Sequence, residues 1–221
     1  MKKIFIMIGF VIAVIAGPSV AANQQYTEGL DYDLLATEQA MDDPKRIEVV
    51  EFFWYGCPHC YQFEPVLNTW AKNIASDVNF YRLPAVFSPL WETHARAYFV
   101  ADILDVLADS HAGMFKALHV DRKKLNSPEQ LAAFYTQYGI NDKRFKKTYQ
   151  STSVNVKVER ARHVINSYGI NGVPALVVAG KYLITTEKGK SFDNMLSIAD
   201  YLIEKERASI KRRLTNNNSA E

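Results

Sequence analysis

The segment FFWYGCPHCYQFEP, residues 52–65, contains both cysteines of this 221-residue chain, Cys57 and Cys60. Pro58 and His59 separate them, and the segment lies where a continuous apolar run gives way to an amphipathic one. A cysteine pair at this spacing can be a structural disulfide, half of a metal site, part of a haem attachment motif or a redox pair that opens and closes. The rest of the sequence distinguishes between these four functions.

The N-terminal segment indicates export. Two lysines precede an uncharged run over residues 4–16, and small residues follow a Gly-Pro break. This order is typical of a secretory signal peptide, and the apolar run is shorter than the roughly 20 residues that a membrane-spanning helix needs. We expect removal of residues 1–22, with cleavage after Ala21 or Ala22, and a soluble product in a compartment where disulfides persist.

The charge balance excludes a large class of partners. The chain has 26 Lys+Arg and 24 Asp+Glu, and residues 1–22 contain two lysines and no acid, which leaves 24 of each after cleavage. A neutral chain lacks the basic surface that binds nucleic acid, so we expect no nucleic acid partner. The remaining 199 residues are sufficient for one domain, or for one domain with an insertion.

Hydrophobic patterning predicts an α/β domain interrupted by helices. A nearly continuous apolar run at 47–54 predicts a strand covered on both faces. A helical pattern follows from Cys57 to about Ala75, and 78–87 predicts a second strand parallel to the first. The other expected elements are an edge strand at 32–36, helices between 89 and 168, a hairpin at 174–186 that turns at Gly180 and Lys181, and a helix at about 191–207.

These elements divide the chain. We expect one α/β domain formed by residues 23–88 and 153–207, with an all-helical insertion at 89–152 and a solvated tail at 208–221. Strands and helices at both ends therefore bracket a helical middle.

The surroundings of the cysteines favour the redox pair. Tyr61 follows Cys60, so the C-x-x-C-H haem pattern is absent. A structural zinc site needs four ligands, and a structural disulfide would close nearly the smallest possible loop and stabilise little. A Cu(I)-binding protein is a weaker alternative, because no further Met or Cys lies near the pair. We expect no metal and no cofactor, and we expect the other histidines to be exposed or satisfied in the core: His94, His111, His119 and His163.

The two cysteines have unequal positions on the expected helix. The turn at 55–56 and Pro58, which suits the first helical position, place Cys57 at the N-cap. Its sulfur then faces the free amides of His59 and Cys60, and the amides, the helix dipole and His59 all favour the thiolate. We expect Cys57 to be the exposed nucleophile with a depressed pKa, and Cys60 to be the partly shielded resolving thiol. A stabilised thiolate makes the disulfide an oxidant of other proteins.

From about Tyr26 to Arg207 the sequence resembles the DsbA family of periplasmic thiol:disulfide interchange proteins, and the CPHC motif at 57–60 is the most specific element of the resemblance. The resemblance implies a thioredoxin fold interrupted by an all-helical insertion domain. It also implies oxidation of newly exported proteins, with re-oxidation by a quinone-linked membrane protein of the DsbB type.

The resemblance also implies two further active-site residues, Pro174 and Val173. Thioredoxin-like proteins place a cis proline opposite the cysteine pair, and Pro174 in Gly172-Val173-Pro174 matches it. Val173 would then offer its backbone to an extended substrate segment beside Cys57.

An acidic residue, Glu51, interrupts the apolar strand that precedes the cysteine pair. Glu51 shares one face of the apolar strand with Val49 and Phe53, and we expect it beneath the active-site helix, where it could relay protons to Cys60. Some relatives carry a buried acid just after the first strand, where this sequence has Ala36, and Glu38 is two residues away from that position.

A reductase or isomerase of the same fold is the alternative function. Isomerases of this kind usually dimerise through an added domain, and the short stretch between residues 22 and 32 leaves no room for one. We therefore expect a monomeric oxidase.

Overall fold

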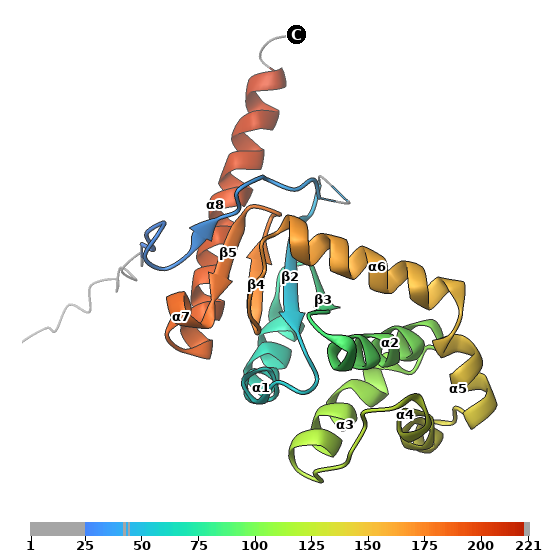
Figure 1. Ribbon diagram of the computed structural model, residues 1–221. Helices are drawn as coiled ribbons and strands as arrows, with labels where there is room; N and C mark the ends of the chain where they lie inside the picture. Colours follow the sequence, from blue (N-terminus) through green and yellow to red (C-terminus); the bar gives the residue numbers. More distant parts are fainter. Residues whose placement is uncertain (1–24, 42, 44, 219–221) are drawn as a thin grey trace, which may run out of the picture.

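The computed structural model describes residues 25–41, 43 and 45–218 and has a five-stranded sheet at its centre (Figure 1). The expected signal peptide lies outside the described residues. The order across the sheet is β1-β5-β4-β2-β3. The strands are β1 (Asp33–Leu34), β2 (Ile47–Phe53), β3 (Val78–Pro84), β4 (Ala175–Val178) and β5 (Tyr182–Thr185).

The pairing of the strands confirms the predicted units. β2 and β3 are parallel and are joined through α1 (Pro58–Asn73), which makes the expected βαβ unit. β4 and β5 form the expected antiparallel hairpin, and Gly180 in its turn has φ +60°. A Cβ at Gly180 would also collide with the carbonyl of Gln39, so this position requires glycine. β1 lies at the edge, paired with β5.

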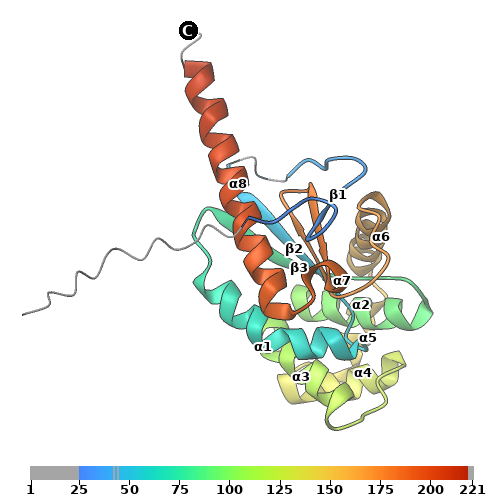
Figure 2. The ribbon, with the colours of Figure 1, turned by 90° about the vertical axis from the view of Figure 1, so that its left-hand side faces the viewer.

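Each face of the sheet is covered by helices, which explains why all of β2 is buried. On one face, α1 and α8 (Phe192–Asn218) pack against Val49, with Leu67 and Leu202 in the same cluster. On the other face, Val50 and Phe52 pack against the end of α6 (Thr152–Ser167). Figures 1 and 2 show the sheet between these two layers.

A helical part lies beyond the carboxyl end of β2 and has a core of its own. Its helices are α2 (Pro89–Ile103), α3 (Leu107–His119), α4 (Pro128–Tyr135), a 3₁₀ turn at Thr136–Tyr138 and α5 (Asp142–Tyr149). Met114, Phe115 and Leu131 are among its fully buried residues. α6 belongs to both parts, because Val158 lies in this core and Ile165 lies in the sheet core. The division at residues 152 and 153 stays a prediction.

The C-terminal segment differs from the prediction. α7 (Thr186–Gly189) precedes α8, and α8 does not end near Arg207 but continues to Asn218, where it extends away from the sheet (Figure 1). Residues 208–216 contain no glycine or proline and include Ala, Lys and Arg, which favour helix. The expected frayed tail is therefore helical through residue 218. Within the described residues, no helix combines the length and apolar character that crossing a membrane requires.

Candidate active site

Cys57 is the N-cap of α1, as predicted. Its backbone is extended, with φ −84° and ψ 117°, and Pro58 begins the helix. The chain enters through a tight turn, in which the Cys57 amide donates to the Trp54 carbonyl at 2.9 Å. Gly56 lies so close to the Trp54 ring that a Cβ would collide with it. This turn directs the Cys57 sulfur toward the first free amides of the helix.

Hydrogen bonds stabilise the Cys57 thiolate. The Cys60 amide donates to the Cys57 Sγ at 3.4 Å. The Cys60 thiol first, then the Cys60 and His59 amides and the charge of His59, lower the pKa of Cys57 from 9.0 to about 6, although burial raises it. Cys57 is only 8% exposed, so the expectation of an exposed sulfur is wrong. The Val173 carbonyl lies 3.5 Å from the sulfur and helps to cover it.

Cys60 has the opposite environment. It is completely buried, and burial raises its pKa well above the ordinary value, followed by the hydrogen bond and charge of Cys57 and by the charge of Glu51. Both cysteines are free thiols in the structure. One sulfur is therefore held as a thiolate near neutral pH, and the other keeps its proton.

The residues expected opposite the pair are in place. The Val173–Pro174 peptide bond is cis, and the Val173 carbonyl oxygen lies 3.5 Å from the Cys57 sulfur. β4 begins directly after Pro174 and pairs with β2. The backbone of Val173 thus borders the Cys57 sulfur, in a position where an extended peptide can pair with it.

His59 and Pro58 are exposed at the start of α1. His59 lines a cavity of about 420 Å³ whose other walls include Val66, Phe192 and Met195. The surface of this cavity is mostly apolar, although Lys190 and Asp193 also line it, and it reaches the CPHC motif through His59. The surface beside the site can therefore accept apolar side chains.

Two histidines of α3 hold the turn that precedes Cys57. The Tyr55 hydroxyl and His111 Nδ1 are 2.8 Å apart, and His119 Nε2 lies 2.8 Å from the Tyr55 carbonyl oxygen. His119 also stacks on the Tyr61 ring, with centroids 5.0 Å apart. The helical part thus contacts the active-site turn through both ends of Tyr55, which is itself almost fully buried.

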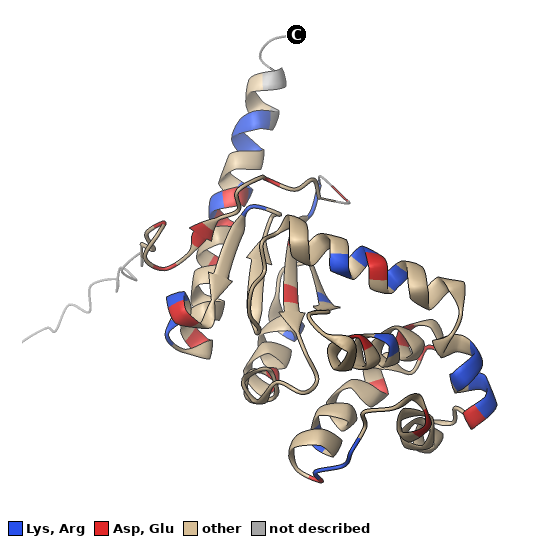
Figure 3. Ribbon diagram, in the orientation of Figure 1, with Lys and Arg blue, Asp and Glu red and all other residues tan. Residues whose placement is uncertain are grey.

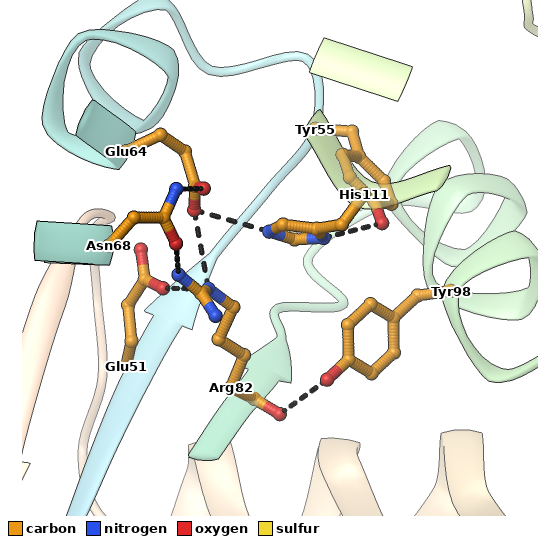
Figure 4. Close-up of polar contacts among 7 residues, drawn as sticks. All are labelled: Glu51, Tyr55, Glu64, Asn68, Arg82, Tyr98 and His111. Carbon is orange, nitrogen blue, oxygen red and sulfur yellow. Dashed lines mark hydrogen bonds and ion pairs between the residues drawn. The ribbon is translucent and has the colours of Figure 1, made fainter. Parts of the chain in front are cut away.

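Glu51 lies in β2, an inner strand between β4 and β3, and not at an edge. It is completely buried, and an acidic segment interrupts β2 in Figure 3. Arg82 Nε lies 2.9 Å from Glu51 Oε2 and 3.2 Å from Glu64 Oε1, and His111 Nε2 lies 3.1 Å from the same Glu64 oxygen (Figure 4). We call Glu51, Glu64, Arg82 and His111 the buried polar cluster.

The two acids of this cluster titrate differently. Burial, with the charges of Glu64 and Cys57, raises the pKa of Glu51 to about 8 against the opposing charge of Arg82. Burial also raises the pKa of Glu64, but hydrogen bonds from His111 and Asn68 and the charge of Arg82 outweigh it and hold that pKa below its ordinary value. A cluster with one protonated and one ionised carboxyl group therefore lies beneath α1 at neutral pH.

The sequence pattern did not identify three members of this cluster. The sequence singled out neither Glu64 nor Arg82, and it gave His111 only as one of several scattered histidines expected to be exposed or satisfied in the core. Arg82 and His111 are separated from Glu51 by 31 and 60 positions, and only the packing of α3 and β3 against α1 brings them together. Ala36 and Glu38 are exposed beyond β1, at the opposite edge of the sheet from β3.

The chain is similar to known proteins over nearly its whole length. The DSBA-like thioredoxin domain family matches residues 78–197. A thiol:disulfide interchange protein DsbA of Pseudomonas aeruginosa is 37% identical over 212 residues, which cover 96% of this chain and 100% of that protein. The protein of the same name from Azotobacter vinelandii is 41% identical over 206 residues, covering 89% and 96%.

Solved structures of DsbA proteins are similar to this chain over most of its length. The crystal structure of Pseudomonas aeruginosa DsbA aligns with a TM-score of 0.80 at 40% identity, over 84% of this chain and 97% of that one. The oxidoreductase DsbA from Xylella fastidiosa aligns with a TM-score of 0.76 at 38% identity, over 80% and 96%. The family match begins at residue 78, so the region of the two cysteines is covered by these whole-chain similarities.

Proposed function

The chain belongs to the DsbA family of thiol:disulfide oxidoreductases, and we propose that it acts as an oxidase that donates the Cys57–Cys60 disulfide to newly exported proteins in the periplasm. The observation that carries this proposal is the opposite environment of the two sulfurs. The pKa of Cys57 is lowered to about 6, whereas that of Cys60 is raised. A good leaving thiolate at Cys57 favours release of the oxidised substrate and of the reduced enzyme.

The reaction has two exchanges. A substrate thiolate attacks the Cys57 sulfur, a substrate–Cys57 disulfide forms, and the electron pair of the broken bond leaves with Cys60, which takes up a proton. A second substrate thiolate then attacks the substrate sulfur and displaces Cys57 as a thiolate. The substrate loses two electrons to the cysteine pair, and two thiol groups of the substrate become one disulfide.

Other residues have defined parts in this scheme. Pro58 begins the helix whose amides stabilise Cys57, and His59 adds its charge. Val173 and Pro174 border the sulfur and offer the Val173 backbone to the extended substrate. Glu51, protonated beneath α1, supplies the proton that the departing Cys60 thiolate needs.

The cycle also needs an oxidant. We infer that a quinone-linked membrane protein of the DsbB type takes the two electrons from the reduced cysteine pair and restores the disulfide. The matched family supports this partner, and the apolar cavity beside His59 is a surface on which it could dock.

The direction of exchange separates the oxidase from its alternatives. The oxidised protein is mixed with an unfolded, reduced protein that has two thiols, and free thiols are counted on both partners with time. We expect two substrate thiols to disappear for every enzyme disulfide consumed, and Cys57→Ser to abolish the reaction. A protein that leaves this substrate reduced, but reduces or reshuffles the disulfides of an oxidised substrate, would be a reductase or isomerase instead.

A further inference from the structure

The two buried acids of the cluster have very different hydrogen-bond partners. Glu64 receives three hydrogen bonds, from Arg82 Nε at 3.2 Å, Asn68 Nδ2 at 2.8 Å and His111 Nε2 at 3.1 Å (Figure 4). Neither carboxyl oxygen of Glu51 has a hydrogen-bond partner among the described residues, although Arg82 Nε lies 2.9 Å away as an ion pair. A buried carboxylate needs donors to stay ionised. The donors therefore favour charge on Glu64 and a proton on Glu51.

The hydrogen bonds also determine which nitrogen of His111 carries hydrogen. An ionised Glu64 can only accept, so His111 Nε2 must donate to it. The Tyr55 hydroxyl keeps its proton, because burial raises the pKa of Tyr55 well above its ordinary value, and it donates to Nδ1 at 2.8 Å. Burial lowers the pKa of His111, which agrees with a neutral ring. Tyr55 thus fixes the tautomer that donates to Glu64.

Aromatic rings of Phe53 and Phe115 pack against His111, and charged or titratable groups face it from several other elements. A cavity of about 600 Å³ borders it and connects the cluster with the surface between α1, α2 and α3. The groups that face this region come from the active-site turn, α1, β3, α2 and the α2–α3 loop: Tyr55, Glu64, Lys72, Arg82, Tyr98, Asp102 and Asp105. Of these groups, Glu64 is the one that lies within hydrogen-bond distance of His111 Nε2, at 3.1 Å.

We propose that His111 is a positioning residue of disulfide exchange: by donating to Glu64, it keeps the shared proton of the two buried acids on Glu51. This rests on the proposed role of Glu51 as the proton donor to Cys60. Without the His111 donor, the proton moves to Glu64, and Arg82 pairs with an ionised Glu51. The helical part of the chain, through α3, then controls the protonation of a residue in the sheet.

The consequence for the reaction follows from the proton balance. When the substrate thiolate breaks the Cys57–Cys60 bond, Cys60 leaves with the electron pair, and the Glu51 carboxylic acid becomes a carboxylate as Cys60 becomes a thiol. If Glu51 were already ionised, this proton would be missing, and a like charge would oppose the departing thiolate. The first exchange would be slower, whereas the N-cap amides of Cys57 would be unchanged.

Two substitutions of one residue separate the two hydrogen bonds of His111. His111→Asn places an amide near the position of Nδ1, so it can still pair with Tyr55 but cannot reach Glu64. His111→Gln places an amide nitrogen near the position of Nε2 and restores the donor to Glu64. His163→Asn makes the same replacement at an exposed histidine of α6 and serves as the control.

The direct test follows the side-chain carboxyl carbons of Glu51 and Glu64 by NMR as the pH is varied. The oxidised protein is used, because neither cysteine titrates in it, and the two signals are assigned by their loss in Glu51→Gln and Glu64→Gln. In the wild type, in His111→Gln and in His163→Asn, we expect Glu51 to titrate at a higher pH than Glu64. In His111→Asn we expect the order to reverse. If His111→Asn does not fold, the wild-type titration still decides, because a Glu64 that titrates above Glu51 overturns the proposal.

A kinetic measurement separates this proposal from the proposed function. General acid catalysis contributes typically about 10²–10⁴-fold, so opening of the disulfide by a small thiol at pH 7 should slow at least about tenfold in His111→Asn and recover in His111→Gln. A wild-type protein that oxidises its substrate while Glu51 and Glu64 titrate alike in both His111 variants overturns the role of His111 alone. A wild-type protein with the expected titration order that fails to oxidise substrate overturns the oxidase function, and the link to Cys60 with it.

Discussion

Cys57 at the N-cap of α1 and Glu64 in the buried polar cluster are both held as anions, but by different groups. Backbone amides and the Cys60 thiol stabilise Cys57, whereas the side chains of Arg82, Asn68 and His111 stabilise Glu64. Backbone donors are present at every helix N-terminus, and Cys60 lies one turn along the same helix, so the first anion depends on where the chain turns and on this one neighbouring thiol. The second depends on each side chain separately. Substitutions should therefore have large effects in the cluster and small effects around the N-cap.

The largest effect is expected for Arg82→Met. Arg82 is the cation that both acids of the cluster share, and its side chain is 18% exposed. Removing one partner of a buried ion pair typically costs about 3–5 kcal/mol, and we expect a loss of that order in the free energy of unfolding by urea. Arg144→Met, at an exposed position of α5, is the matched control. Equal midpoints for the two variants would show that the cluster is not an ion-pair system.

The redox state should change how stability depends on pH. The folded pKa of reduced Cys57 is depressed from 9.0 to about 6, so its contribution is complete above pH 9 and is lost as pH falls through 6. Between pH 5.5 and 8.5 the reduced protein should gain about 3 kcal/mol of unfolding free energy over the oxidised one. Urea curves of both forms at these pH values test this. A difference that does not change with pH would mean that the N-cap does not hold a thiolate.

Glu51→Gln should stabilise the protein. The folded pKa of Glu51 is raised from 4.5 to about 8, so folding binds a proton, and the stability that this group contributes below pH 4.5 is lost as the pH rises toward 8. Glutamine does not titrate, and we expect the variant to exceed the wild type by on the order of 1–3 kcal/mol at pH 7. The same variant should oxidise substrate more slowly.

The control for this substitution is Glu28→Gln, at an exposed position. A Glu51→Gln protein that is less stable than the wild type at pH 7 would show that Glu51 is ionised in the folded state, and the comparison between the two regions would lose its basis.

The smallest effect is expected for His59→Ser. The charge of His59 is the last of the main causes that lower the pKa of Cys57, after the Cys60 thiol and the backbone amides. Its removal should raise that pKa by less than one pH unit, or about 1 kcal/mol. The rate of Cys57 alkylation against pH reports the change, with His163→Ser as the control. A larger shift would show that the charge of His59 outweighs the Cys60 thiol and the amides in stabilising the Cys57 thiolate.

Local sequence patterns were sufficient to predict the region around the N-cap of α1. The apolar run before Cys57, the turn with Gly56 and the proline after Cys57 lie within a few residues of each other, and together they specify a strand, a turn and a helix N-cap. The βαβ unit and the hairpin at Gly180 were predictable for the same reason. Pro174 and Val173 came only from the resemblance to a family, because nothing in their own neighbourhood points to a cysteine far away in the sequence.

The buried polar cluster could not be predicted in the same way. Glu51 stood out because an acid interrupts an apolar strand, but its partner Arg82 comes from β3 and His111 from α3. Their meeting depends on how α3 packs against α1, which no local pattern encodes. The prediction of where α8 ends was wrong for a different reason. No residue between Arg207 and Asn218 stops a helix, but the basic, asparagine-rich composition of this segment suggested a solvated tail.

The reduction potential of the cysteine pair tests the central claim most directly, namely that the N-cap stabilises the reduced form and makes the disulfide an oxidant. The protein is equilibrated with glutathione buffers at pH 7, and the fraction of oxidised Cys57–Cys60 is measured at each ratio. Oxidants such as protein disulfide isomerase lie near about −180 mV and the reductant thioredoxin near about −270 mV. The account predicts a value less negative than about −200 mV. A value close to that of thioredoxin would contradict it.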